Sequence, residues 1–157
     1  MKKITRAISI IDDENSKDPN FEFFNGEKFP KEFLYSKRMS ERLVNFAPES
    51  SDIMKIAVRG HHICRWEIPR TEFSNDRKGY LKWRIQLYSY HADKVSLILK
   101  EVGYEEDFID RVASIIKKQK LKKDPEAQLL EDVICLVFLE HYFVDFARKH
   151  EEKKVID

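Results

Sequence analysis

The sequence predicts an all-α protein, a single compact bundle of about six helices that spans residues 1–157. Three observations predict this class. The chain contains only four glycines and five prolines, whereas sheets joined by tight hairpins need more glycine at positive φ. Apolar residues recur at helical spacing along most of the chain. Hydrophobic residues make up 42% of the sequence, which is enough for one sizeable core.

Proline and capping residues delimit the first predicted helices. Pro19 ends the first one, because proline disfavours the α conformation in the residue before it. Residues 20–29 are interpreted as a packed loop, although Phe21–Phe24 would also fit a short strand. Pro30 fits the first position of the second helix, and a serine at 50 or 51 fits the cap of the third. The first helix is expected from residue 4 to the break at Asp18-Pro19, with its apolar positions over 4–11, and the next two are expected over residues 30–46 and 51–64.

The second half of the chain contains the longest predicted helix and the most apolar one. Gly103 is a suitable C-cap for the long helix. Asp124 and Pro125 supply a cap and a first-position proline for the last helix. Residues 129–146 are apolar on nearly every side, which predicts a place in the centre of the bundle. The lysine-rich tract 117–123 is interpreted as the solvated end of a helix. The expected helices cover residues 79–102, 105–118 and 124–146.

Charge and cysteine content exclude several classes of protein. With 29 Lys and Arg against 28 Asp and Glu, the formal net charge is +1, which argues against a histone-like binder of nucleic acid with a wholly basic surface. Two cysteines provide neither a disulfide framework nor a four-cysteine zinc site. No apolar stretch approaches the roughly 20 residues that span a bilayer. We therefore expect a soluble cytoplasmic protein without a membrane partner, and the sequence leaves its oligomeric state open.

Three histidines need a physical reason for their positions, because burying an ionisable group is costly unless it is paired or bound to a metal. His61 and His62 come late in the third predicted helix, directly after Gly60. A glycine inside a helix makes the helix about 1 kcal/mol less stable than an alanine does, so Gly60 indicates that another group packs closely against the backbone. His91 shares a helical stripe with apolar residues at 87, 95 and 98, so we expect it to face inward.

Two acidic residues, Glu131 and Asp132, stand immediately before the most apolar run of the chain. Asp132 shares its helical stripe with Cys135 and Leu139, so we expect it to be buried or nearly so. Imidazoles and one carboxylate brought inward from three helices are the usual composition of a metal site in a helical bundle. The alternative is structural: the histidines are hydrogen-bonded core residues, and the acids interact with the helix dipole.

A cationic segment connects the histidine pair to the helix of His91. Between residues 55 and 84, basic side chains outnumber acidic ones by about five, and aromatic residues are interleaved with them. Arginine binds phosphate through two parallel hydrogen bonds, and an indole face stacks on a base. The alternative is a set of surface salt bridges to the acidic C-terminal half. The candidate phosphate-binding residues are Arg59, Arg65, Arg70 and Arg84, and the candidate stacking residues are Trp66 and Trp83.

The chain carries four specific motifs: RGHHICRWEIPR at 59–70, GYLKWR at 79–84, HA at 91–92 and LED at 130–132. Together they resemble an uncharacterised family, the domain of unknown function numbered 4202, sometimes labelled glutamyl-tRNA synthetase-like. The family pattern often has Gln at the position of His61, which implies that His62 is the better ligand candidate. A catalytic synthetase needs a nucleotide-binding α/β domain, and this chain has neither the length nor the glycines for one.

The order of the helices is more distantly similar to that of the HD-type metal phosphohydrolases, which are all-α bundles. Their ligands are a histidine, an adjacent His-Asp pair and a later Asp. The resemblance implies a divalent metal ion held by His62, His91 and Asp132. Glu131 is then the candidate general base. The chain departs from the pattern because it has no His-Asp pair and because Lys37-Arg38 occupies the place of the early histidine.

The leading hypothesis is a metal-dependent hydrolase that acts on a phosphorylated small molecule, for example a nucleotide. The metal ion would activate water and polarise the phosphoryl oxygen, while the arginines would hold the substrate phosphate. The second hypothesis is a non-catalytic module on an HD-like scaffold that binds nucleotide or RNA through the same arginines and tryptophans. The departures from the HD pattern favour this alternative. A third is a structural protein whose polar centre fixes the register of its helices.

Overall fold

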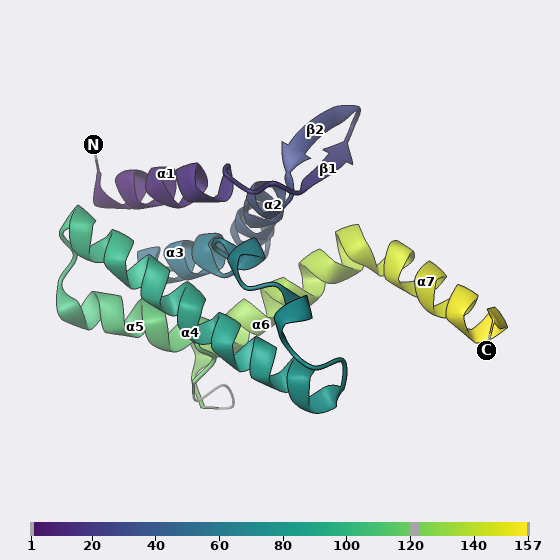
Figure 1. The fold of residues 1–157 in the computed structure, drawn as a ribbon. Helices are drawn as coiled ribbons and strands as arrows, with labels where there is room; N and C mark the ends of the chain where they lie inside the picture. The colour runs from purple at the N-terminus through teal and green to yellow at the C-terminus, as the bar shows by residue number, and fades with distance from the viewer. Residues whose placement is uncertain (1, 120–122, 157) are drawn as a thin grey trace.

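A computed structural model describes residues 2–119 and 123–156, with side chains up to residue 150. The predicted all-α class is confirmed, because these residues form seven α-helices and one small hairpin (Figure 1). Two short 3-10 turns, Arg65–Glu67 and Arg70–Glu72, lie in the long connection before the fourth helix. The elements in chain order are α1 (Lys3–Asn15), β1 (Phe21–Phe24), β2 (Glu27–Pro30), α2 (Lys31–Phe46), α3 (Asp52–Gly60), α4 (Arg77–Val102), α5 (Glu106–Ile116), α6 (Pro125–Val137) and α7 (Phe143–Ile156).

The segment 20–29 forms a β-hairpin, so its interpretation as a loop is wrong and the alternative of a short strand is confirmed. β1 pairs antiparallel with β2, with Phe21 opposite Pro30. The turn consists of Asn25 and Gly26, which have φ values of 52° and 79°. Two positive φ values match the twist of a two-residue hairpin, and Asn-Gly is the sequence that such a turn prefers. The hairpin projects from the start of α2 (Figure 1).

Helix α3 ends at Gly60, four residues before the predicted end at Cys64, because the chain turns sharply between these residues. Cys64 adopts a left-handed conformation with a φ of 54°. Its amide donates to the buried side-chain oxygen of Asn15 at 3.1 Å, which holds the turn against α1. The predicted close approach at Gly60 is confirmed, since a Cβ there would lie 2.6 Å from Cγ2 of Val95 on α4.

One hydrophobic core connects the helices and fixes the orientation of α4. Helices α4 and α5 pack as an antiparallel pair (Figure 1), and α1, α3 and α6 pack against one or both of them. The predicted inward stripe of α4 is confirmed, because Leu87, His91, Val95 and Ile98 are all buried. An ionisable side chain, His91, is therefore held in the interior. The assignment of residues 1–157 to one domain stays a prediction.

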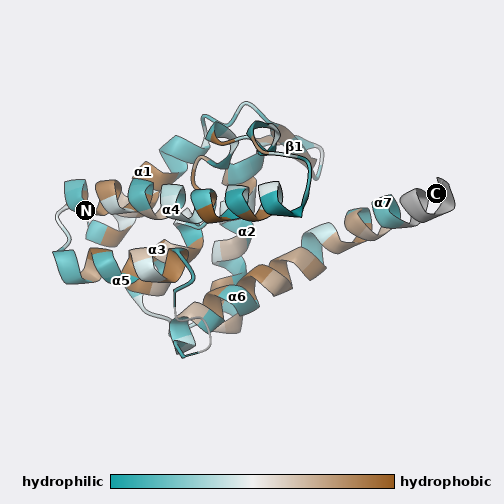
Figure 2. Ribbon diagram, turned by 60° about the horizontal axis from the view of Figure 1, so that its bottom comes forward, coloured by the Kyte–Doolittle hydropathy of each residue, from teal (hydrophilic) through white to brown (hydrophobic). Residues whose placement is uncertain are grey.

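The last predicted helix is not continuous. A π-helical turn at Phe138–Tyr142 separates α6 from α7, and Figures 1 and 2 show α7 extending away from the other helices. The expectation that residues 129–146 lie in the centre of the bundle is wrong after Val137, because Leu139 and Val144 are each 58% exposed. A π turn adds one residue to a helical turn, so the residues after it no longer continue the buried face of α6. None of the described helices combines the length and the apolar character that crossing a bilayer requires.

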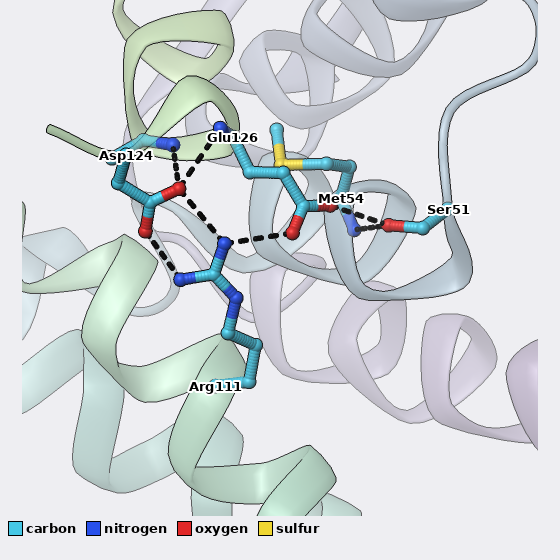
Figure 3. Close-up of polar contacts among 6 residues, drawn as sticks. Ser51, Met54, Arg111, Asp124 and Glu126 are labelled. Atoms are coloured by element: carbon cyan, nitrogen blue, oxygen red, sulfur yellow. Dashed lines mark hydrogen bonds and ion pairs between the residues drawn. The ribbon is translucent and has the colours of Figure 1, made fainter.

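An ion-pair network fixes the start of α6 against α5 and α3 (Figure 3). Arg111 on α5 binds both carboxylate oxygens of Asp124, and its Nη2 donates to Glu126 at 2.8 Å. Asp124 also caps α6, as predicted, by accepting from the amides of residues 126 and 127. At the start of α3, Ser51 donates to Glu126 at 2.7 Å. The network therefore determines how α6 enters the bundle.

Replacing Arg111 by Met is expected to lower the free energy of unfolding by about 1 kcal/mol, because a partly exposed ion pair contributes little. The hydrogen bonds from Arg111 hold the pKa of Asp124 at about 2, below its ordinary 3.8. A carboxyl with a lowered pKa stabilises the fold above its unfolded pKa and loses that contribution as the pH falls. Urea unfolding should therefore show that the difference in the free energy of unfolding between wild type and Arg111→Met decreases from about pH 4 to about pH 2. The matched control is Arg6→Met on the exposed face of α1, and an equal loss there would contradict the prediction.

Candidate functional site

A pocket of about 520 Å³ opens between α2, the turn after α3, α4 and the π-helical turn. Segments far apart in the sequence contribute charged, polar and aromatic side chains to its wall. We name it the histidine pocket. Its charged, polar and aromatic lining residues are Lys31, Glu32, Tyr35, His61, His62, Arg65, Tyr80, Trp83, Arg84, Tyr88, His91, Lys118, Phe138 and Tyr142.

The three imidazoles of the pocket form a packed group. The rings of His61 and His62 stack with 4.1 Å between their centroids. Tyr35 stacks on His62 at 4.4 Å, and the ring of His91 lies 5.8 Å from that of His62. The Nδ1 atom of His91 donates to the carbonyl oxygen of Ile63 at 2.7 Å. In the neutral ring, this hydrogen bond leaves Nε2 of His91 as an acceptor.

Burial keeps all three imidazoles neutral near pH 7. It is the largest cause that lowers the pKa of His61 and the pKa of His62 well below 6.5. Burial also lowers the pKa of His91 to about 4, against the hydrogen bond to Ile63 that raises it. The nearby guanidinium of Arg65 lowers the pKa of His62 further. The rings can therefore accept protons or hydrogen bonds from a ligand.

Glu32 is the carboxylate of the described pocket wall, and it is 6% exposed. Burial raises its pKa, although the charge of Arg65 acts in the opposite direction. Oε2 of Glu32 lies 3.6 Å from Nδ1 of His62, which is too long for a hydrogen bond. Within the described residues, this oxygen, Nδ1 of His61 and Nε2 of His91 are buried without a hydrogen-bond partner. Buried polar atoms are normally satisfied, so three such atoms in one pocket indicate that a ligand or ordered water supplies their partners.

Two guanidinium groups face the same pocket without a carboxylate partner. The guanidinium of Arg65 lies over the ring of Trp83, 5.0 Å from its centroid, and forms no hydrogen bond or ion pair with the part of the chain that the structure describes. Arg84 bonds the hydroxyl of Tyr88 and likewise has no acidic partner there. Guanidinium groups of this kind are suited to bind an anion through two hydrogen bonds. The cationic lining residues are Lys31, Arg65, Arg84 and Lys118.

Lys118 contradicts the interpretation of the tract 117–123 as a solvated helix end; residues 120–122 of that tract lie outside the described residues. Its side chain is 13% exposed and lines the pocket. The backbone at Lys118 has a φ of 60°, which ends α5 and changes the direction of the chain. Its ammonium forms an ion pair with Glu131 at 2.8 Å. Glu131, the predicted general base, does not line the pocket, and in this arrangement it positions Lys118.

Five of the predicted site residues meet in the histidine pocket. They are contributed by two segments, the turn after α3 and residues 83–91 of α4. Their proposed roles as metal ligands, phosphate-binding groups and stacking residue stay predictions. The five residues are His62, Arg65, Trp83, Arg84 and His91.

The predicted metal-ligand set is not assembled, because Asp132 lies outside the pocket. Asp132 is only half-buried, and its Oδ1 accepts from Gln128 at 2.9 Å. Its stripe of α6, shared with Cys135 and Leu139, is on the exposed side of the helix. Among the side chains of residues 2–119 and 123–150, no three His, Cys, Asp or Glu are arranged to hold one metal ion. The described donors therefore do not fit a divalent ion, and no chemical step is assigned to one.

The remaining predicted residues contribute elsewhere. Arg59 forms two hydrogen bonds of 2.7 Å with Asp12, which join α3 to α1 outside the pocket. Arg70 donates to the carbonyl oxygen of Ser74 at 2.9 Å and so holds the connection before α4. Trp66 is partly buried against the core and lines an adjacent cavity.

Several pocket residues were not identified from the sequence. Glu32 lies in the first turn of α2, where a carboxylate normally interacts with the helix dipole in solvent. Its spacing to Tyr35 and Met39 places it on the buried stripe of α2, and this spacing could have predicted its burial from the sequence. Arg38, which occupies the place of the early histidine of the HD pattern, donates to Glu22 at 2.6 Å and to Tyr142 at 2.9 Å.

The fold and the pocket define an all-α protein with a cationic, histidine-lined cavity. A family model described as Domain of unknown function (DUF4202) matches residues 5–157, so the chain belongs to this family. The resemblance inferred from the four motifs is thereby confirmed. The match gives no support to the glutamyl-tRNA synthetase-like label or to the likeness to HD-type phosphohydrolases. Searches of curated proteins and of solved structures found no match to the chain.

Proposed function

We propose that the histidine pocket binds the phosphate group of a small phosphorylated molecule. One observation carries the proposal: Arg65 and Arg84, which have no acidic partner among the described residues, face one pocket together with Lys118. Four cationic side chains and one carboxylate line this pocket. A cavity of about 520 Å³ lies within the usual range for small-molecule sites. The excess of positive charge in a partly buried cavity favours an anionic ligand.

The imidazoles add a second requirement on the ligand. Nε2 of His91 and Nδ1 of His61 are buried and unpartnered among the described residues, and a neutral ring nitrogen accepts a hydrogen bond. Glu32, whose pKa burial raises, can donate a hydrogen bond when it is protonated. The ligand that fits has hydroxyl groups as well as a phosphate. A phosphorylated sugar or a nucleotide has both.

Calorimetric titration with ribose 5-phosphate tests this proposal. Arg65→Met should weaken binding by about tenfold or more, because a charge-assisted hydrogen bond to phosphate contributes about 1.5–3 kcal/mol. Lys118→Met should weaken it in the same direction. The matched control is Arg77→Met, which removes the same charge from an exposed position of α4 outside the pocket. Unchanged affinity in both Arg65→Met and Lys118→Met, or an equal loss in Arg77→Met, would overturn the proposal.

A further inference from the structure

A second cavity of about 420 Å³ adjoins the histidine pocket. It lies between the α1–β1 connection, the start of α2 and the connection that precedes α4. We name it the tryptophan cavity, because Trp66 and Trp83 line it together with Arg65 and Arg70. Both cavities share part of their wall, which places them next to each other. The shared residues are Lys31, Glu32, Arg65 and Trp83.

The wall of the tryptophan cavity is held rigidly before any ligand arrives. Nε1 of Trp83 donates to the carbonyl oxygen of Ile68 at 2.8 Å, which fixes the indole on α4. Trp66 packs with its partly buried side against the hydrophobic core. Asp18 is 2% exposed, and its two oxygens accept from the amides of Asn20 and Glu32 at 2.9 Å each. Preorganised aromatic surfaces of this kind bind a flat ring at a low cost in conformational entropy.

Charge and aromatic character alternate along this wall. The guanidinium carbons of Arg65 and Arg70 lie 5.0 and 6.0 Å from the centroid of the Trp83 ring. Arg70 is held in place by the carbonyl oxygen of Ser74, so it does not depend on a ligand for its position. Indole faces and guanidinium planes both stack on nucleobases. At the boundary between the cavities, Lys31 and Arg65 supply the positive charge for a phosphate.

We propose that the ligand of this protein is a nucleotide whose phosphate lies in the histidine pocket and whose base lies in the tryptophan cavity. The inference rests on the proposed function, because it takes the phosphate position from it and adds the class of the organic group. The base stacks against Trp66 and the arginine-flanked wall formed by Trp83. A small nucleotide is favoured over RNA, because the chain as a whole has a net charge of only +1, whereas the binding of a polynucleotide depends on many basic contacts to its phosphates.

Trp66 and Trp83 are the two tryptophans of the chain, so intrinsic fluorescence reports directly on the tryptophan cavity. In Trp83→Phe, Trp66 is the single emitter. Its emission should change on titration with AMP and should not change with ribose 5-phosphate, which lacks the base. Trp66 lines the tryptophan cavity and not the histidine pocket, so an unchanged signal with AMP would contradict the proposal.

Calorimetry with the same two ligands measures the contribution of the base. The wild-type protein should bind AMP at least about tenfold more tightly than ribose 5-phosphate, as expected for one base stacked on an aromatic side chain. Trp66→Leu should remove most of this preference for AMP over ribose 5-phosphate and leave the affinity for ribose 5-phosphate unchanged. Trp66→Phe keeps an aromatic face and should retain much of the preference for AMP. This comparison with Trp66→Leu separates a loss of stacking from a loss of structure.

The outcomes distinguish this inference from the proposed function. Binding of ribose 5-phosphate without any gain from the base overturns the nucleotide inference alone. Failure of both ligands to bind overturns both proposals. A single-stranded oligonucleotide that binds more than about tenfold more tightly than AMP makes RNA the ligand and overturns the choice of a small nucleotide.

Discussion

At pH 5 the protein is expected to be several kcal/mol less stable than at pH 7.5 when a chelator is present in both buffers. His91 has a pKa of about 4 in the folded chain, whereas an unfolded histidine titrates near pH 6.5. Between these two pKa values the unfolded chain binds a proton that the folded chain does not. The free energy of unfolding is therefore highest above about pH 6.5 and falls as the pH decreases. His61 and His62, whose pKa values burial also lowers, act in the same direction. At pH 5, the titration of His91 alone removes about 2 kcal/mol.

Urea unfolding followed by circular dichroism between pH 7.5 and pH 5 measures this effect above the range in which most carboxylates titrate. In His91→Gln, the slope of stability against pH should decrease by about one proton, because glutamine does not titrate. His150→Gln, at an exposed position of α7, should keep the wild-type slope. A wild-type stability that stays constant between pH 7 and pH 5 would mean that the imidazoles are not buried in the neutral form.

Gly79→Ala is expected to lower the free energy of unfolding by about 2–3 kcal/mol, although alanine is the better helix former. A Cβ at Gly79 would overlap with the carbonyl oxygen of Ser74 and would lie 2.7 Å from its carbonyl carbon. Backbone atoms cannot rotate away as the end of a flexible side chain does, so the first turn of α4 must shift. That turn leads into Trp83 and Arg84, and the variant should also bind ribose 5-phosphate more weakly.

The control for this substitution is Lys78→Ala, which places the same residue at the neighbouring exposed position. It should change the free energy of unfolding by no more than about 0.5 kcal/mol. Urea unfolding of the two variants side by side makes the comparison. Equal stability of the two variants would show that the close contact between α4 and Ser74 is absent in solution.

The parts of the fold that follow from local sequence could be predicted well. Asp124 and Pro125 begin α6, and Gly103 follows the last residue of α4, because caps depend on a few neighbouring residues. The inward orientation of His91 follows from the apolar stripe on its own helix. Gly60 indicated a close approach correctly, but the sequence could not show that the approaching group is Val95.

The composition of the pocket could be predicted only in part. Arg65 and Arg84 were found because a cationic and aromatic segment is visible in one stretch of sequence. Lys118 was missed because a lysine tract at a helix end is normally solvated, and only the left-handed turn at this residue places its ammonium in the pocket. Asp132 was expected inside because it shares a helical stripe with Cys135 and Leu139. The covered face of α6 proves to be the opposite one.

Periodicity and capping act within a few residues, so most of the helices, their caps and the burial of His91 on α4 could be predicted from local sequence. Which side chains share a pocket depends on contacts between segments far apart in the chain, so it could be learned from the folded structure alone. The π-helical turn at Phe138–Tyr142 illustrates the reason. Adjacent helical residues point about 100° apart, so one added residue changes which face of the following helix meets the bundle.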